Sequence, residues 1–538
     1  MKYLGIIDFS LIETSDGKPL AYFEEAFSNI SFLKIFLNRV KKINGLDQIV
    51  ALIHPKLKVQ LEPFLEEFSF IDRYYLPEGN IAHHYQGQDT IIKARKWNYN
   101  TFRGGCKETN FFDEVLPMEI IKDIGNQVSA ESMLYLTPEQ PLFDLEYTQQ
   151  LLEQNEIITE HKPPFLVRQT VQGLSPFLMT KEGFSQLKTV NWSPRLVFTS
   201  HAGGDGMNIM RRKIENEPYD LARGSFALRS KRDAIHLGFI LNKLESEKLA
   251  WSAKNMIEAS SIYMDNTPKE IDLECTGAPF PERTGLPQGI PQSEMPIELF
   301  HKIYNEICSW EDGLLSLGDL SDILTHSESG ALLKILKEKK PYGLHIVLNT
   351  EKLLLEENLQ EWLEIPADII TLRVTTLSDS LFHSITDCED LIKIFSEYYL
   401  GKGEALPCIN LELHKREDNL QDIHTVVEIA NRYGCSYNWI AHNDYCQQVN
   451  TSPVIQSTPK KRYACEKLLN QVYILSDGRV SSCKQDFSGK MSWGDLNNNT
   501  IQEVWNSEKY LDARKSQIEG EHKKTTHLCK NCHQWVHA

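Results

Sequence analysis

The stretch YACEKLLNQVYILSDGRVSSC, residues 463–483, holds two cysteines on either side of a pattern typical of a β-hairpin. Residues 472–475 and 480–482 are short strand-like runs, and the four residues between them include Gly478, which can supply the positive φ of a tight turn. The pattern predicts that the chain folds back on itself after Cys465. Cys483 is then returned to the neighbourhood of Cys465.

A second arm of the C-terminal region carries two more cysteines. Thr500 and Glu503 have the spacing of a helix capping box, which predicts a helix beginning at residue 501. The apolar stripe of that helix is expected to be Ile501, Val504, Trp505 and Leu511. Cys529 and Cys532 follow it with C-x-x-C spacing, which lets two sulfurs face one metal centre.

Cys465, Cys483, Cys529 and Cys532 are therefore the candidate metal ligands. Four thiolates suit either zinc or an iron–sulfur cluster, and the spacing of these four does not separate the two. Four unrelated buried thiols would be the alternative, since free cysteines are commonly buried. The combination of a turn-bounded cysteine with a C-x-x-C pair favours a metal site.

These cysteines and their surroundings resemble the SPASM domain that follows radical S-adenosylmethionine barrels. The matching features are twelve residues between Cys465 and Gly478, four between Gly478 and Cys483, the C-x-x-C pair, and the segments 493–496 and 501–507. The resemblance implies that the four cysteines ligate an auxiliary [4Fe–4S] cluster. Because the cysteines of a second auxiliary cluster are missing, we expect one cluster with all four ligands from the protein.

Composition and charge limit the class of protein. The 538 residues are 41% hydrophobic and 24% charged, with a formal net charge of −17, so we expect a globular, multidomain chain that does not bind nucleic acid. No apolar run is long enough to span a membrane, and no signal peptide is recognisable. Together with an odd number of cysteines, eleven, these features favour a cytoplasmic protein with reduced thiols.

Residues 1–190 are expected to form one α/β domain. Residues 3–7, 48–53 and 132–137 are apolar runs suited to buried parallel strands, and residues 32–40 are expected to form a crossover helix. Residues 191–266 are expected to be a connecting region that includes one long helix over residues 233–256.

The N-terminal domain resembles the nucleotidyltransferase fold of nucleotide-sugar and polysaccharide-biosynthesis cytidylyltransferases. The segments 17–20, 38–40, 102–104 and 141–144 carry the resemblance, which implies that Lys18 and Arg103 neutralise phosphates while Glu139 and Asp144 hold a divalent cation. The Arg/Gly-rich loop that cradles phosphates in active relatives is replaced by a segment beginning at Asp8. We therefore expect the fold without transferase chemistry.

Residues 267–455 alternate between strand and helix patterns. The expected strands are residues 270–274, 314–317, 344–348, 369–374, 409–413 and 437–441. A helical stripe that lies between two of them contains Ile297, Phe300, Tyr304 and Ile307. Six β-α repeats predict a parallel sheet curled into a partial (β/α)6 TIM-like barrel, whose ligands would bind beyond the carboxyl ends of the strands.

This region resembles the radical S-adenosylmethionine barrel through residues 271–276, 317–320 and 346–350. The resemblance implies that Gly318 and Asp319 stand where the family binds the amino end of S-adenosylmethionine. The family's C-x-x-x-C-x-x-C motif is absent, because its three positions hold Pro279, Arg283 and Leu286. We expect Cys275 to be a strand residue and S-adenosylmethionine not to be cleaved by this chain.

Taken as a whole, the chain resembles the spiro-SPASM proteins, an α/β multidomain organisation that ends in a SPASM iron–sulfur domain over residues 456–538. The first hypothesis for function is an iron–sulfur protein that binds a peptide, protein or sugar-linked partner or transfers electrons. The second is an enzyme, either a nucleotidyltransferase or a modification enzyme that binds S-adenosylmethionine. The third is a structural protein stabilised by zinc at the four cysteines.

Overall fold

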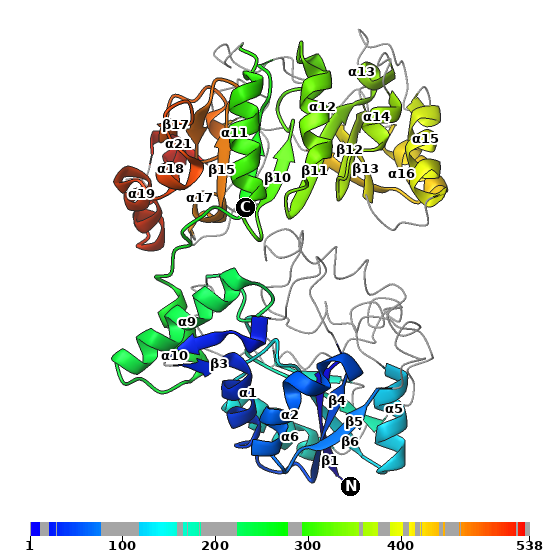
Figure 1. The fold of residues 1–538 in the computed structure, drawn as a ribbon, viewed down its shortest axis with the longest axis vertical. Coiled ribbons are helices and arrows are strands. Elements are labelled where there is room, and N and C mark those ends of the chain that lie inside the picture. Colours follow the sequence, from blue (N-terminus) through cyan, green and yellow to red (C-terminus); the bar gives the residue numbers. More distant parts are fainter. Residues whose placement is uncertain are drawn as a thin grey trace. The chain divides into compact units, whose positions relative to one another are not determined.

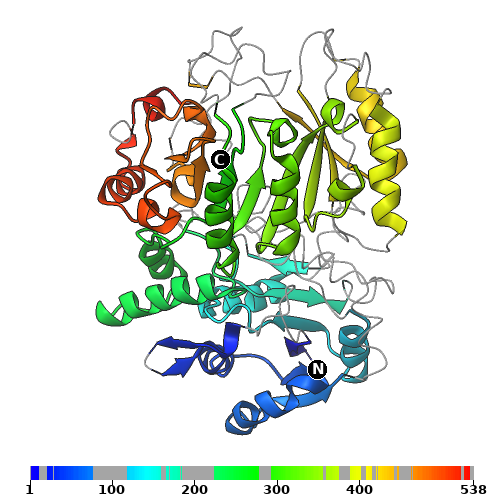
Figure 2. The ribbon, with the colours of Figure 1, turned by 45° about the horizontal axis from the view of Figure 1, so that its top comes forward.

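The chain forms two compact units, Met1–Tyr263 and Met264–Ala538. The structure is a computed structural model, shown in Figure 1 and Figure 2. It describes residues 2–10, 21–27, 29–76, 118–158, 165–168, 170–181, 183, 223–277, 293–354, 359–374, 388–401, 408–414, 420, 422–440, 445–446, 462, 464–522 and 526–532.

The N-terminal unit is built around a six-stranded sheet of order β5-β4-β1-β6-β8-β7. Its strands are β1 (Tyr3–Phe9), β2 (Glu25–Phe27), β3 (Ile30–Ser31), β4 (Gln48–Ile53), β5 (Asp72–Tyr75), β6 (Ser132–Leu136), β7 (Phe165–Val167) and β8 (Phe177–Thr180), of which β2 and β3 form a separate small sheet. Its helices are η1 (Ala21–Phe23), α1 (Phe32–Val40), η2 (Pro55–Leu57), α2 (Lys58–Glu67), α5 (Met118–Gln127), α6 (Leu145–Ile157), α9 (Lys231–Ser246) and α10 (Ala253–Ser260).

The strands and the helix expected in residues 1–190 are confirmed. β1 pairs in parallel with both β4 and β6, and α1 connects β1 to β4 through the short β2 and β3 strands. Side chains of β1 alternate between two apolar cores, with Ile7 in one and Ile6 in the other, as expected for a strand that is covered on both faces. The sheet is therefore buried at its centre, as its apolar runs predict.

The region expected to connect two domains contributes instead to the core of the first unit. Helices α9 and α10 replace the single helix expected over residues 233–256, and Lys248 lies between them with φ of 53°. Leu237 and Leu241 of α9 and Met256 of α10 are buried in the same apolar cluster as the central strands. The apolar side chains of α9 and α10 are buried by packing against the sheet.

The C-terminal unit contains a nine-stranded sheet of order β14-β13-β12-β11-β10-β9-β15-β16-β17. Its strands are β9 (Glu270–Leu273), β10 (Leu314–Leu317), β11 (Gly343–Asn349), β12 (Ile369–Val374), β13 (Cys408–His414), β14 (Ser436–Ile440), β15 (Gln471–Ile474), β16 (Arg479–Ser481) and β17 (Gly494–Asp495). Its helices are α11 (Ile297–Cys308), η5 (Ile323–Thr325), α12 (Ser329–Glu338), α13 (Thr350–Leu354), α14 (Leu359–Leu363), α15 (Glu389–Gly401), α16 (Asp422–Tyr433), α17 (Glu466–Asn470), η8 (Lys484–Asp486), α18 (Ile501–Trp505), α19 (Glu508–Ile518) and α21 (His527–Asn531).

The six β-α repeats expected between residues 267 and 455 are present. Strands β9 to β14 pair in parallel in chain order, and helices from α11 to α16 connect them (Figure 1). Phe300, Tyr304 and Ile307 of α11 are buried against this sheet. We call strands β9–β14 and their connecting helices the parallel βα sheet.

The predicted hairpin of the C-terminal region is confirmed as β15 and β16, which pair in antiparallel fashion. Gly478 has φ of 89° in the turn between them. The sequence did not reveal that β15 also pairs in parallel with β9, with Ile474 opposite Leu273. The hairpin thereby extends the parallel βα sheet beyond β9, and Figure 2 shows the orange hairpin region beside the green part of the chain.

The capping box predicted for the second arm is also present. Thr500 accepts a hydrogen bond from the backbone N–H of Glu503, and the Glu503 carboxylate accepts one from the backbone N–H of Thr500. The expected single helix is wrong in length, because α18 ends at Trp505 and α19 begins at Glu508. Tyr510, rather than the expected Leu511, lies on the buried face of α19.

Candidate functional site

The four candidate cysteines are positioned by the ends of short helices and by the hairpin. Cys465 precedes α17, and its backbone N–H donates to Gln517 Oε1 at 3.2 Å. Cys483 lies between β16 and η8. Cys529 lies in α21, where its N–H donates to Thr526 Oγ1 at 3.0 Å, and Cys532 directly follows that helix.

The fold brings the four thiols close enough for their charges to interact. Cys483 interacts electrostatically with Cys465, Cys529 and Cys532, and Cys465 interacts with both members of the C-x-x-C pair. Burial raises the pKa of the Cys465 thiol to about 11, and burial also raises the pKa values of Cys483 and Cys529. Without a metal these groups are neutral thiols, so metal binding would release protons.

The donor set fits an iron–sulfur cluster. Four neighbouring cysteine sulfurs supply the thiolates that a [4Fe–4S] cluster needs, and no disulfide removes any of them. Among the described residues, no three histidine, cysteine, aspartate or glutamate side chains are grouped as the ligands of a single metal ion.

Aromatic side chains lie beside the cysteines. The rings of Trp493 and Tyr510 stack with centroids 4.9 Å apart, and Tyr510 is close enough to Cys465 and Cys483 for electrostatic interaction. Arg514 lies over the Trp505 ring, 3.9 Å from its centroid. This apolar environment limits water at the thiols and contributes to their raised pKa values.

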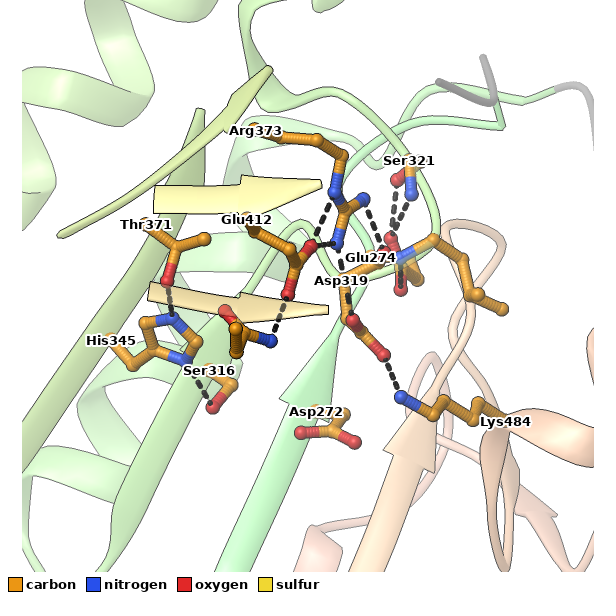
Figure 3. Close-up of polar contacts among 12 residues, drawn as sticks. Asp272, Glu274, Ser316, Asp319, Ser321, His345, Thr371, Arg373, Glu412 and Lys484 are labelled. Atoms are coloured by element: carbon orange, nitrogen blue, oxygen red, sulfur yellow. Dashed lines mark hydrogen bonds and ion pairs between the residues drawn. The ribbon is translucent and has the colours of Figure 1, made fainter. Parts of the chain in front are cut away.

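A second group of polar side chains lies at the carboxyl ends of the parallel strands. Asp319, which directly follows β10 and Gly318, lies between two cations (Figure 3). Its Oδ2 accepts from Lys484 Nζ at 2.5 Å, and its Oδ1 is 3.6 Å from Arg373 Nη2. The Asp319 backbone carbonyl also accepts from Arg373 Nη1 at 2.9 Å.

Arg373 is fully buried at the end of β12 and has a second carboxylate partner. Its Nε donates to Glu412 Oε1 at 2.6 Å, and Glu412 lies opposite it in the register of β12 and β13. Glu412 also accepts from Asn438 Nδ2 at 3.2 Å. The pairing leaves Arg373 and Glu412 mutually neutralised inside the sheet.

Glu274, which follows β9, organises the loop after β10. Its carboxylate accepts hydrogen bonds from the backbone N–H groups of Leu320 and Ser321, each at 2.8 Å, and from the Ser321 hydroxyl. A side chain at Gly318 would be crowded in this loop, because an added Cβ would lie 3.0 Å from the Ser321 carbonyl oxygen. Gly318 and Asp319 therefore have structural partners in the chain itself.

Comparison with known proteins identifies the C-terminal part of the chain. Residues 465–533 match the profile of the SPASM family, described as an iron–sulfur cluster-binding domain. Residues 465–533 are a SPASM domain. All four candidate cysteines lie in the SPASM domain, which makes up a minor part of the chain.

One curated protein is similar over a limited region. It is the S-adenosyl-L-methionine-dependent 2-deoxy-scyllo-inosamine dehydrogenase of Niallia circulans, which is 29% identical over 97 residues. Those residues are 18% of this chain and 38% of the dehydrogenase. The chain thus spans well under half of the length of the curated relative that it matches.

Solved structures align with parts of the chain. BtrN in complex with AdoMet and 2-DOIA covers 50% of this chain and 94% of its own, with 18% identity and a TM-score of 0.34. Streptococcus suis SuiB bound to the precursor peptide SuiA covers 59% and 76%, with 11% identity and a TM-score of 0.37. A cytidylyltransferase from Leptospira borgpetersenii covers 49% and 98%, with 10% identity and a TM-score of 0.31.

The nucleotide-binding residues expected in the N-terminal unit are only partly described. Lys18 and Arg103 lie outside the described residues. Glu139 Oε2 is 3.3 Å from Arg229 Nε. The Asp144 carboxylate caps α6 through the N–H of Tyr147 at 2.9 Å and accepts from the N–H of Ala253 at 2.6 Å.

Asp8 lies at the carboxyl end of β1, where the resemblance would place a phosphate-binding loop. Its carboxylate accepts from the Tyr135 hydroxyl at 2.6 Å and from the backbone N–H of Ser10 at 2.8 Å. Burial raises the pKa of Asp8, and the charge of Glu139 raises it further. A carboxyl group at this position does not complement a phosphate.

Sequence reasoning missed Cys446, Lys484, Arg373 and Glu412. The thiol of Cys446 donates a hydrogen bond to Gln485 Oε1 of the SPASM domain at 3.8 Å, although nineteen positions separate Cys446 from Cys465. A charged residue at equivalent positions of two adjacent predicted strands was a usable signal for Arg373 and Glu412.

Residues 279, 283 and 286, expected to replace cluster-binding cysteines, lie outside the described part of the chain. Cys275 lies two residues beyond the end of β9 and is fully buried in the core.

In the described part of the chain, no helix has the length and apolar composition to cross a membrane.

Proposed function

We propose that this protein binds one [4Fe–4S] cluster through Cys465, Cys483, Cys529 and Cys532 and acts in partner binding or electron transfer. The observation that supports the proposal is the match of residues 465–533 to the SPASM family, which includes all four cysteines, together with the electrostatic interaction of Cys483 with the other three. Four cysteine ligands complete the coordination of a [4Fe–4S] cluster, which leaves no iron open for substrate. The cluster is then structural or an electron carrier.

The proposal includes the loss of radical chemistry on this chain. Cleavage of S-adenosylmethionine needs a cluster with three cysteine ligands in C-x-x-x-C-x-x-C spacing, and that spacing occurs nowhere in the sequence. Asp319, expected to contact S-adenosylmethionine, is paired with Lys484 and lies beside Arg373. Both features support a binding role for the parallel βα sheet, with a peptide, protein or sugar-linked partner.

The first test is anaerobic purification followed by visible absorption and metal analysis. We expect a coloured protein that contains iron and sulfide, with iron lost in Cys483→Ser and retained in Cys435→Ser, whose cysteine lies outside the SPASM domain. Colourless protein containing zinc would refute the cluster and favour the structural alternative. The tail of the Cys483→Ser variant should also be more susceptible to proteolysis, since metal binding and folding are coupled in small metal modules.

The second test concerns S-adenosylmethionine. Reduced, cluster-loaded protein is incubated with S-adenosylmethionine, and 5′-deoxyadenosine is quantified by chromatography. We expect none above the level of a control without protein. Formation of 5′-deoxyadenosine would overturn the loss of radical chemistry while leaving the auxiliary cluster intact.

A further inference from the structure

Strand β14 lies at one end of the nine-stranded sheet, and β13 is the only strand that pairs with it in the described part of the chain. Its first three residues, Ser436, Tyr437 and Asn438, are exposed, and Tyr437 keeps 43% of its surface accessible. The outer edge of a terminal strand presents backbone N–H and C=O groups in a row. These groups can pair with another extended segment.

The other end strands of the two large sheets have features that usually prevent edge pairing. β17 has two residues and β7 has three, so both edges are short. β5 carries the exposed charged residues Asp72 and Arg73. β14 has five residues, with the sequence SYNWI, and contains neither a charged residue nor a proline. It is therefore the longest and least protected of these four edges.

The residue order of β14 makes the strand complementary to a second copy of itself. Two copies related by a two-fold axis pair such strands in antiparallel fashion. With full overlap, Asn438 lies opposite the same residue of the second copy, and Tyr437 lies opposite Trp439. The rings of Tyr437 and Trp439 already pack together within one copy, with centroids 5.5 Å apart. Pairing would add two cross-strand aromatic pairs, which stabilise a sheet.

The charges and amides near this edge are compatible with self-pairing. No like charges would face each other across the two strands, because β14 is uncharged. Arg432, at the end of α16, forms an ion pair with Glu389, so these two charges compensate each other. The Asn438 amide carries both donors and an acceptor and can bond to an identical amide. The formal net charge of −17 on each copy repels over a longer range, and salt screens that repulsion.

We propose that two copies of this chain associate through antiparallel pairing of their β14 strands, which joins the two parallel βα sheets across a two-fold axis. Five strand residues span about 17 Å, so the contact is smaller than a standard interface of about 800 Å² per partner. The dimer should therefore be weak, and its formation should depend on concentration. The association does not require the metal centre.

Sedimentation velocity of the full-length protein over a wide concentration range tests the association. We expect a monomer at low concentration and a dimer at high concentration. Tyr437→Lys removes both cross-strand aromatic pairs and adds a charge at the edge, so the dissociation constant should rise by about tenfold or more. The control Tyr75→Lys changes a tyrosine that is 37% exposed on the end strand β5, and it should leave the dissociation constant unchanged.

Hydrogen–deuterium exchange of the wild-type protein locates the contact without any substitution, and it decides the question should Tyr437→Lys not fold. Exchange should slow at high concentration in residues 436–440 and stay unchanged in residues 72–75. A monomer at every concentration would overturn the proposal and leave this edge to an extended peptide of another protein. A dimer with unchanged exchange at residues 436–440, or one equally stable in Tyr437→Lys, would also overturn it, because the contact would then lie elsewhere.

Discussion

Arg373 illustrates how one buried charge depends on its partners. It is fully buried and bonded to Glu412, and it also contacts Asp319. Removing one partner of a buried ion pair leaves the other charge without compensation, which typically costs about 3–5 kcal/mol. We therefore expect Arg373→Met to lower the free energy of unfolding by about 3–5 kcal/mol, measured by urea denaturation.

The control for this change is Lys337→Met, which removes an exposed ion pair with Glu364. The two side chains are 27% and 49% exposed, so we expect a loss of about 0–1 kcal/mol. The double variant Arg373→Met/Glu412→Leu should lose less than Arg373→Met alone, because neither charge of the pair is then left buried. An equal or greater loss in the double variant would contradict this account of Arg373.

Glu274 is expected to make stability depend on pH. Burial raises the pKa of its carboxyl above the usual value. Protonation of Glu274 therefore contributes to the free energy of unfolding, and this contribution is fully present below the unfolded-state pKa. It decreases as the pH rises from the unfolded-state pKa to the folded-state pKa, because folding takes up a proton in that range. Unfolding free energies measured across that window should fall with increasing pH.

Glu274→Gln should remove this contribution to the pH slope, while the exposed substitution Glu298→Gln in α11 should preserve it. Glu274→Gln should also be less stable than the wild-type protein by about 1–3 kcal/mol at every pH. The reason is that an amide NH2 cannot accept both of the backbone N–H groups that Glu274 satisfies. A pH slope equal to that of wild type would show that the ionisation of Glu274 is not coupled to folding.

At the scale of elements, the hairpin of the SPASM domain depends on Gly478. Its φ of 89° is unfavourable for any residue with a Cβ, at about 1–2 kcal/mol. A Cβ at Gly478 would also lie 2.8 Å from Asn497 Nδ2 and 3.0 Å from Leu299 Cδ2. We expect Gly478→Ala to destabilise the hairpin by more than that conformational cost and to lower the iron retained on purification.

The variant Gly520→Ala separates the cost of positive φ from the cost of steric contacts with the added Cβ. Gly520 also has positive φ, 80°, but an added Cβ would meet no atom within 4 Å. Thermal unfolding should therefore show a smaller loss for Gly520→Ala than for Gly478→Ala, and iron content should stay at the wild-type level. Equal losses in the two variants would mean that the contacts with Asn497 and Leu299 are unimportant.

At the scale of the whole molecule, we predict that the full-length protein does not bind CTP with Mg²⁺. Glu139 is paired with Arg229, and both oxygens of the Asp144 carboxylate accept backbone N–H groups, so neither is poised to hold a cation. Asp8 places a buried carboxyl group where the resemblance would put a phosphate-binding loop. The measurement is calorimetric titration of the full chain, with Glu139→Ala as its matched variant.

Saturable binding of CTP that disappears in Glu139→Ala would contradict this prediction. Such binding would support nucleotidyltransferase activity of the N-terminal unit, which is part of the second hypothesis for function. Binding that persists in Glu139→Ala would place a nucleotide elsewhere in the chain. It would still contradict the prediction, although Glu139 would have no part in it.

Periodicity and turn chemistry in the sequence were sufficient for most elements and for part of the candidate site. Strands β10 and β12 have the predicted bounds, and so does helix α1, because strand and helix periodicity is local information. The hairpin and the C-x-x-C pair are local as well, so their four cysteines could be named from spacing. Whether those cysteines bind iron remains a prediction.

Tertiary structure alone decided which distant residues meet. The pairing of β15 with β9 and the ion pairs of Arg373 with Glu412 and Asp319 join segments that are far apart in the chain. Cys446 reaches Gln485 of the SPASM domain for the same reason. Burial energies depend on the surface that a segment finds in three dimensions, and the pattern of its own residues does not specify that surface.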